Sequence, residues 1–174
     1  MKFNNGQWMM KPGVTSYNCE QIRATELNEE KTNLWLYGVT YQYDGRSLDG
    51  PAIELEISSP QPDILRLRAV HFKGDTKKYA RFELFDAKCR LEVEDRQDRV
   101  TVRSGKTLLV IEKRPSCFTW YYDGRKLTGV GSQFGKSMLS YVAAPEGPFM
   151  RAQLDLDIGE HVYGIGERFT PFVR

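Results

Sequence analysis

The chain has 174 residues, of which 40% are hydrophobic, 12% aromatic and 28% charged, and this composition excludes an intrinsically disordered chain. No segment approaches the ~18 consecutive apolar residues of a membrane span, so no membrane partner is expected. The 25 Lys and Arg residues against 23 Asp and Glu residues leave a net charge of +2, which excludes the strongly basic footprint of a nucleic-acid-binding protein.

The amino terminus and the cysteines indicate where the protein works. The first residues include one Lys but no apolar run after it, so they do not match a secretory signal peptide. The three cysteines, Cys19, Cys89 and Cys117, are odd in number and form no Cys-x-x-Cys pair, and the chain has only two histidines. We therefore expect free thiols, a cytoplasmic location, and neither a metal site nor a cofactor.

Strand signals dominate the chain, and helix signals are weak. Residues 19–30 contain good helix formers but no apolar stripe, and residues 79–88 would form at most one short helical turn. Residues 33–43 are rich in aromatic and β-branched side chains. Residues 53–57 and 65–69 alternate apolar and polar side chains, which is typical of strands with one buried face.

Further strands are predicted in the second half of the chain, at residues 91–94, 99–103, 107–113 and 117–122. Two predicted strands end on Asp-Gly, at Asp44-Gly45 and Asp123-Gly124, which is a favoured hairpin dipeptide. Many short strands separated by turn residues predict an all-β fold, an antiparallel β-sandwich. No stretch is long and loose enough to be a linker, so residues 1–174 are expected to form one domain.

The last part of the chain carries its most distinctive motif. Residues 154–158 alternate Leu or Ile with Asp, a glycine follows, and the run Val-Tyr-Gly-Ile-Gly-Glu-Arg-Phe comes next. The pattern predicts a strand, a tight turn and a second strand whose glycines allow close approach of another layer. A dinucleotide site is strongly disfavoured, because the third glycine of G-x-G-x-x-G would fall at Phe169 and no helix pattern follows. Asp155 and Asp157 would share one side of the first strand, where a solvated face is favoured over an acid/base pair.

Aromatic and histidine side chains offer weaker candidates. Phe118, Trp120 and Tyr122 share one face of a predicted strand, and core packing is favoured over a platform for sugar rings. His71 and His161 have no other ligand-type residue close in sequence, so structural roles are favoured for both. No Ser-His-Asp or Cys-His arrangement declares itself, and we predict no catalytic residue in this chain.

The carboxy-terminal motif resembles that of the α-xylosidase-like branch of glycoside hydrolase family 31. Leu-Asp-Leu at residues 154–156, Gly-Glu at 159–160 and Val-Tyr-Gly-Ile-Gly-Glu-Arg-Phe-Thr at 162–170 have the order and spacing of that branch. Asn-Gly-Gln-Trp at residues 5–8, with Lys-Pro-Gly shortly after it, and a Ser-Ser-Pro that precedes His71-Phe72 spread the resemblance over the whole chain.

The resemblance implies a galactose-mutarotase-like β-sandwich that lacks its last strands, with a catalytic (β/α)₈ barrel following after residue 174. Members of the family cleave α-linked glycosides with retention, through an Asp nucleophile and an Asp acid/base in the barrel, whose carboxyl groups lie about 5–5.5 Å apart. The chain is then a non-catalytic amino-terminal domain that supports the active site, and it is inactive alone. The parent enzyme would bind an α-linked oligosaccharide, and the choice between xyloside and glucoside stays open.

The resemblance also places six residues near the sugar pocket of the parent enzyme, in supporting roles. The glycines would dock on the barrel, the two charged residues would fix the loop by hydrogen bonds, and the Phe would be buried against the barrel. These residues are Tyr163, Gly164, Gly166, Glu167, Arg168 and Phe169. A sandwich without its barrel exposes an apolar patch, so a homo-oligomer is also expected.

Two other classes of function remain open. The first is a free-standing carbohydrate-binding module that uses the face with Trp120. The second is a sandwich enzyme of the mutarotase kind, whose chemistry needs a histidine and a carboxylate on one concave sheet. His71 and His161 are the only histidines that could serve it.

Overall fold

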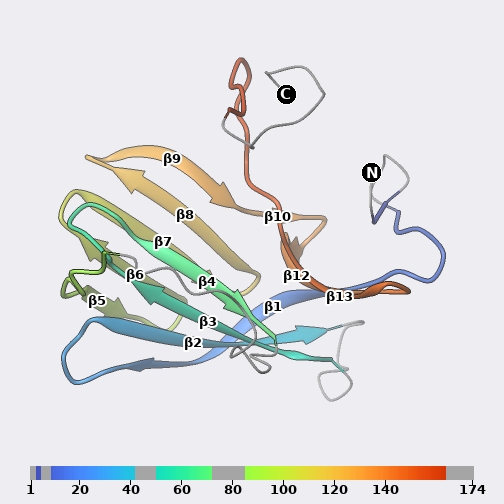
Figure 1. The fold of residues 1–174 in the computed structure, drawn as a ribbon, viewed down its shortest axis with the longest axis horizontal. Helices are drawn as coiled ribbons and strands as arrows, with labels where there is room; N and C mark the ends of the chain where they lie inside the picture. The colour runs from blue at the N-terminus through green and yellow to red at the C-terminus, as the bar shows by residue number, and fades with distance from the viewer. Residues whose placement is uncertain (1–2, 5–8, 42–49, 72–84, 164–174) are drawn as a thin grey trace.

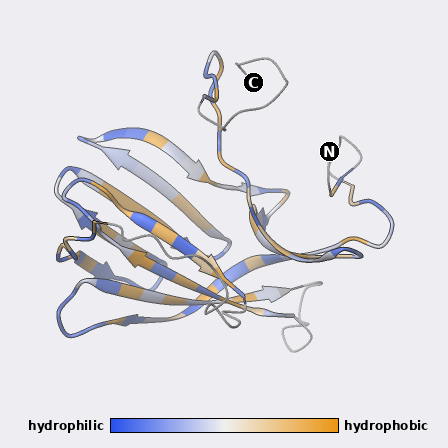
Figure 2. Cartoon of the chain, in the orientation of Figure 1, coloured by the Kyte–Doolittle hydropathy of each residue, from blue (hydrophilic) through white to orange (hydrophobic). Residues whose placement is uncertain are grey.

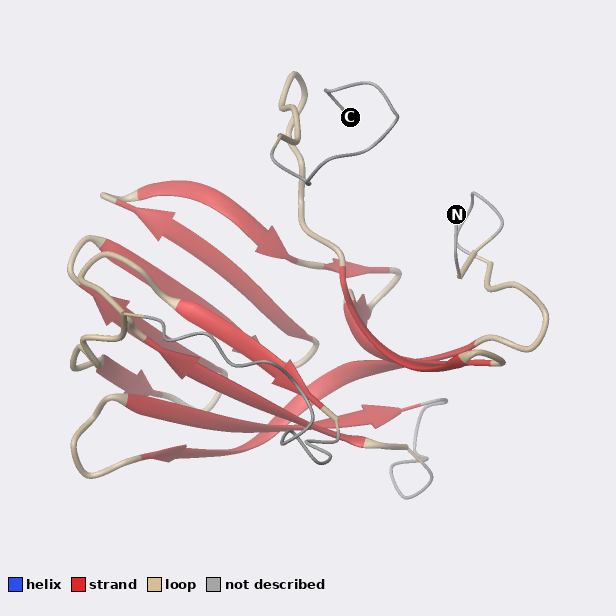
Figure 3. Ribbon diagram, in the orientation of Figure 1, coloured by secondary structure: helices blue, strands red, loops and turns tan. Residues whose placement is uncertain are grey.

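The computed structural model describes residues 3–4, 9–41, 50–71 and 85–163, and every regular element within them is a β-strand (Figure 1, Figure 3). These ranges contain no helix that is long and apolar enough to cross a membrane. All strand pairs are antiparallel, which confirms the all-β prediction.

The strands form two main sheets and a small hairpin. The six-stranded sheet has the order β13-β12-β1-β2-β3-β4, and the five-stranded sheet follows chain order from β5 to β9. The first sheet consists of β1 (Thr15–Leu27), β2 (Asn33–Tyr41), β3 (Ala52–Ser58), β4 (Arg66–Val70), β12 (Leu139–Ala144) and β13 (Gly147–Ala152). The second consists of β5 (Glu92–Asp95), β6 (Arg99–Ser104), β7 (Thr107–Lys113), β8 (Ser116–Tyr122) and β9 (Arg125–Val130). The small hairpin follows β9 and precedes β12 in the chain, and it pairs β10 (Ser132–Gln133) with β11 (Lys136–Ser137).

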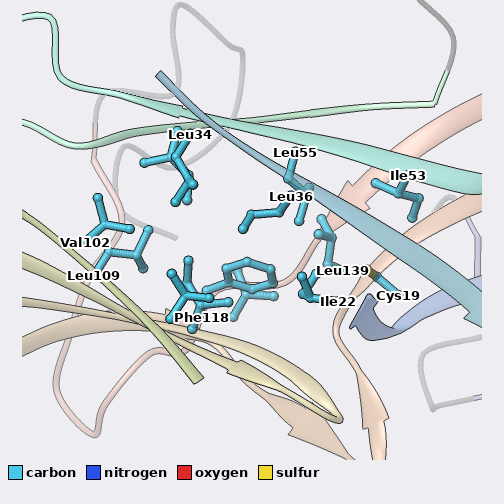
Figure 4. Packing of buried hydrophobic residues seen from close by; sticks show 14 of the residues in the cluster. Cys19, Ile22, Leu34, Leu36, Ile53, Leu55, Val102, Leu109, Phe118 and Leu139 are labelled. Carbon is cyan, nitrogen blue, oxygen red and sulfur yellow. The ribbon is translucent and has the colours of Figure 1, made fainter. Parts of the chain in front are cut away.

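The core lies between the two sheets, where buried apolar side chains of both sheets form one cluster. Figure 2 shows the hydrophobic residues distributed along the strands of both sheets. Leu36 and Leu55 are paired across β2 and β3 and are fully buried, and Leu109 and Phe118 are fully buried in the facing sheet. Figure 4 shows the ring of Phe118 among the side chains of both layers. Burial of each such side chain contributes about 1.5–3 kcal/mol to folding.

Polar contacts also join the sheets. Thr25 of β1 donates a hydrogen bond to Asp95 of β5, and Lys113 Nζ lies 2.5 Å from the other oxygen of the same carboxylate. Burial opposes the ionisation of Asp95, but the hydrogen bonds from Lys113 and Thr25 outweigh it and lower its pKa. Ser116 of β8 donates to the carbonyl oxygen of Cys19 in β1.

Residues 19–30, a poor helix candidate by sequence, form no helix, and most of this range belongs to β1. The register of β1 against β2 shifts between Cys19 and Gln21 and again between Ile22 and Ala24. A bulge adds a residue to one strand, so Cys19 and Ile22 both lie in the core although they are three residues apart. That spacing belongs to a helix and hides the strand periodicity.

The two predicted Asp-Gly turns have different outcomes. Asp123 and Gly124 have φ angles of +49° and +79° and connect the paired residues Tyr122 and Arg125, as a two-residue hairpin turn requires. The turn predicted at residues 44–45 lies outside the described residues, as does most of the weak helical candidate at 79–88, whose described residues 85–88 are irregular.

Candidate functional site

The candidate site predicted from the sequence begins in the segment that follows β13, residues 153–163, which we call the tail. In Figure 1 the tail leaves the end of β13 and rises past β10. Its start is held by backbone hydrogen bonds, from Gln153 N to Met138 O at 3.2 Å and from Asp155 N to Gly129 O at 2.8 Å. Thr128 Oγ1 donates to Asp155 O at 3.1 Å. The tail is therefore fixed to β9 at one point.

The carboxylate of Asp155 also contacts β9, and glycine provides the room for it. Lys126 Nζ lies 3.5 Å from Asp155 Oδ2. A Cβ atom on Gly129 would lie 3.0 Å from that carboxylate oxygen and 2.8 Å from Phe118 O in β8. Only glycine avoids both contacts without a shift of backbone or tail, so Gly129 permits the anchor.

The tail is not a strand, so the prediction of a strand over residues 154–158 is wrong. Asp155 and Asp157 therefore do not form the carboxylate face of a strand, and Asp155 is paired with Lys126. Leu154, Leu156 and Ile158 are 62%, 57% and 107% exposed. A segment with alternating residues forms a strand only where its backbone N–H and C=O groups pair with a neighbouring backbone. The backbone of β9 accepts one such hydrogen bond, from Asp155 N to Gly129 O.

The predicted tight turn is present at the tip of the tail. Gly159 has a φ angle of +84°, and Glu160 N donates to Asp157 O at 3.1 Å. The carboxylate of Glu160 in turn accepts a hydrogen bond from Asp157 N at 2.9 Å. Between the tail and β9 lies a recess of about 310 Å³ that Leu127, Leu156 and other residues line.

Of the six predicted site residues, the structure describes one. Tyr163 is 58% exposed, and its ring lies edge-on to His161 with a centroid distance of 6.3 Å. The other five lie outside the described residues. They are Gly164, Gly166, Glu167, Arg168 and Phe169.

The aromatic face of β8 belongs to the core. Phe118 is fully buried, and Trp120 is half-buried, pairs with Leu109 and packs against the core cluster. Tyr122, at the end of the strand, is 41% exposed. The favoured interpretation of this face as core packing is therefore confirmed for Phe118 and Trp120.

The histidines lie on different parts of the molecule. The ring of His71 is 4.3 Å from that of Tyr141, and His71 Nδ1 is 3.1 Å from Ala52 O. His161 lies on the tail. Within the described residues no group of three or more His, Cys, Asp or Glu side chains could hold a metal ion.

The buried thiols are not poised as nucleophiles. Burial raises the pKa of Cys19 to about 11, and a weaker effect of the same kind raises the pKa of Cys117. A thiol protonated at neutral pH is a poor nucleophile. All three cysteines are free, and Cys89 is the least buried of them.

A larger cavity, of about 790 Å³, lies elsewhere and was not predicted from the sequence. Its lining comes from the amino-terminal segment, β1, the β10–β11 hairpin, and β13 with the residue after it. Arg151 and Asn18, which line it, are 133 positions apart, and neither belongs to a recognisable motif. Only the fold brings such residues together.

Comparisons with known proteins identify the family of the chain and agree with its fold. The family model for the glycosyl hydrolase 31 N-terminal galactose mutarotase-like domain matches residues 54–174, and the chain belongs to this family. An uncharacterised protein of Listeria monocytogenes has a similar fold, with a TM-score of 0.64 at 17% identity over 92% of this chain and 14% of that one. The cycloalternan-forming enzyme of Listeria monocytogenes, solved with a pentasaccharide substrate, has a TM-score of 0.53 at 17% identity, over 74% of this chain and 11% of that one.

Two curated relatives are similar in sequence over the whole chain. The alpha-xylosidase of Emericella nidulans is 28% identical over 193 residues, which include 25% of that protein. The alpha-xylosidase XylQ of Lactiplantibacillus pentosus is 22% identical over 177 residues, which include 23% of that protein. The chain thus spans about a quarter of the length of these relatives.

Proposed function

We propose that residues 1–174 form the non-catalytic amino-terminal domain of a retaining α-glycoside hydrolase of the α-xylosidase or α-glucosidase type, and that a catalytic barrel follows in the same polypeptide. The family membership and the two alpha-xylosidase relatives, about four times as long as this chain, support the proposal. The substrate of the whole enzyme would be an α-linked oligosaccharide.

The observation that carries the supporting role is the tail. It is anchored to β9 through Asp155, yet Leu154, Leu156 and Ile158 are exposed. Burial of each of these side chains against another surface would contribute about 1.5–3 kcal/mol. The tail leads directly to Gly164 and Phe169, so docking it on the barrel would bring the predicted site residues to the sugar pocket.

The alternative of a free-standing carbohydrate-binding module loses its main support. Its sugar platform needs an exposed aromatic face, whereas Phe118 is fully buried and Trp120 packs on the core. A sandwich enzyme is disfavoured as well, because its chemistry needs a histidine beside a carboxylate, whereas the ring of His71 contacts Tyr141 and the carbonyl oxygen of Ala52.

The supporting role is tested in the longer polypeptide with Arg168→Ala and Glu167→Gln. Hydrolysis of p-nitrophenyl α-xyloside and α-glucoside is measured, and the preferred sugar decides the branch. We expect kcat/KM to fall at least tenfold with the melting temperature unchanged. The control is Arg125→Ala, at an exposed residue of β9. Unchanged kcat/KM in both variants would contradict a supporting role for Glu167 and Arg168 at the sugar pocket.

The exposed aliphatic side chains also predict self-association of the 174-residue chain. Sedimentation velocity is expected to show a dimer at high concentration, and Ile158→Asp is expected to return the chain to a monomer, because it adds a charge to the patch. A chain that stays monomeric at several hundred micromolar would contradict this use of the patch.

We also propose that the protein works in the cytoplasm. The three thiols are free, and Cys19 and Cys117 are buried in separate strands, which suits a reducing compartment. Fractionation of the source cells, followed by detection of the protein, tests the location directly.

A further inference from the structure

The cavity of about 790 Å³ has the size of a small-molecule site, since such sites range over about 300–1,000 Å³. Strand β1 contributes Ser16 and Asn18 to its lining, the β10–β11 hairpin contributes Gln133 and Lys136, and β13 contributes the guanidinium group of Arg151. The cavity shares no lining residue with the recess beside β9, and of the tail only the first residue, Gln153, lines it.

Arg151 is the chemical centre of this cavity. Its Nε donates to Ser140 Oγ at 3.2 Å and one terminal nitrogen donates to Ser16 Oγ at 3.4 Å, while the other lies 3.9 Å from the sulfur of Met10. All three partners are neutral, and burial lowers the pKa of the guanidinium. A guanidinium group has five N–H donors, so one donor remains on each terminal nitrogen. A carboxylate accepts such a pair side by side.

The charge of the lining favours an anion. Lys136 is a second cation, and none of the described residues that line the cavity is acidic. Among the described residues no carboxylate forms an ion pair with Arg151. A half-buried charge without a counter-ion is costly, and a bound carboxylate would offset that cost.

Phe134 supplies an independent observation. It is 76% exposed, lines the cavity and has a φ angle of +52°. It occupies the first central position of the two-residue turn between the paired residues Gln133 and Lys136, where Asn or Gly is usual. A bulky residue at positive φ is strained, and such strain is concentrated at binding sites. The turn thus holds an aromatic ring at the edge of a cationic cavity.

We infer that this cavity binds a saccharide that carries a carboxylate, a uronic acid residue. The carboxylate pairs with Arg151, one face of the pyranose ring stacks on Phe134, and the side-chain amides of Gln133 and Gln153 bond to ring hydroxyls. The site does not depend on the proposed hydrolase function, because no bond is broken in it.

The test is isothermal titration of the 174-residue chain with three probes. These are methyl β-D-glucuronide, methyl β-D-glucoside, which replaces the carboxylate with a hydroxymethyl group, and sodium acetate, which lacks the ring. We expect the glucuronide to bind at least tenfold more tightly than either of the others. Equal affinity for the glucoside would overturn the role of Arg151, and equal affinity for acetate would overturn the saccharide.

Variants assign the binding to the cavity. Because Phe134 is exposed, Phe134→Ala should fold, and we expect it to weaken glucuronide binding about tenfold. The control is Phe85→Ala, at a ring that is 74% exposed and does not line the cavity, and this variant should bind as the native chain does. Arg151→Lys keeps the charge but loses the paired donors, so it should also weaken binding at least tenfold, with Arg125→Ala as its control. Unchanged binding in Phe134→Ala or in folded Arg151→Lys would overturn the proposal.

Discussion

Replacement of Trp120 by alanine separates a core residue from a sugar platform. Trp120 lies between fully buried Phe118 and Tyr122, which is 41% exposed, and it packs against the core beside Leu109. Loss of a fully buried tryptophan costs about 3–5 kcal/mol. Because Trp120 is only half-buried, we expect the lower end of that range, about 3 kcal/mol. Tyr122→Ala, at the exposed end of the same face, should cost about 1 kcal/mol or less.

Thermal and urea unfolding followed by circular dichroism measure both variants. In a domain of this size 1 kcal/mol shifts the melting temperature by about 2–4 °C. Trp120→Ala should therefore lower it by about 6–12 °C, and Tyr122→Ala by about 4 °C or less. Nuclear magnetic resonance titration with a neutral xylo-oligosaccharide should give the same result for Trp120→Ala and for the native chain.

The reasoning would be refuted by a Trp120→Ala chain that melts within about 2 °C of the native one and no longer binds an oligosaccharide that the native chain binds. That result would place Trp120 on a binding surface and restore the carbohydrate-binding module.

Three further predictions concern the anchor, the thiols and acid stability. Gly129→Ala should destabilise the chain by about 1–3 kcal/mol in urea unfolding, because its Cβ would lie 2.8 Å from a backbone oxygen. Gly131→Ala is the control and should cost less, because the nearest contact of its Cβ is a side-chain oxygen at 3.4 Å. Equal costs for the two variants would contradict the steric argument. Cys89 should react with dithiobis(nitrobenzoate) at pH 8 in the native chain. Cys19 should react only after unfolding, since burial hides its thiol and raises the pKa of Cys19 to about 11. Rapid reaction of Cys19 in the native chain would contradict its burial. The pKa of Asp95 is lowered from 3.8, so its ion pair stabilises the fold above about pH 4, and this contribution is lost as the pH falls through the folded pKa. Asp95→Asn should cost at most about 1 kcal/mol at pH 7 for this partly exposed pair. A cost that does not shrink as the pH is lowered into the acid range would contradict the assignment.

The strands that alternate without interruption could be predicted from the sequence. Ile53, Leu55 and Ile57 are buried at every second position, and so are Leu109 and Ile111. In these strands the backbone follows the regular period, so side-chain pattern and burial coincide. The sandwich fold follows from them.

The remaining elements depend on information that local sequence does not contain. The bulges of β1 place Cys19 and Ile22 on the same face and imitate helical spacing. The alternation of the tail predicts a strand, but a strand also needs a partner backbone, and the backbone of β9 accepts one hydrogen bond from the tail, at Gly129 O. Arg151 reaches its cavity only through the pairing of β13 with β12 and of β12 with β1.

The most direct test of the supporting role compares the 174-residue chain with the longer polypeptide of which we propose it to be the amino-terminal domain. Hydrolysis of p-nitrophenyl α-xyloside and p-nitrophenyl α-glucoside is followed for both at equal molar concentration. We expect turnover of at least one substrate by the longer polypeptide and none by the chain alone. Turnover by the chain alone would contradict the central claim and would place catalytic residues within the β-sandwich.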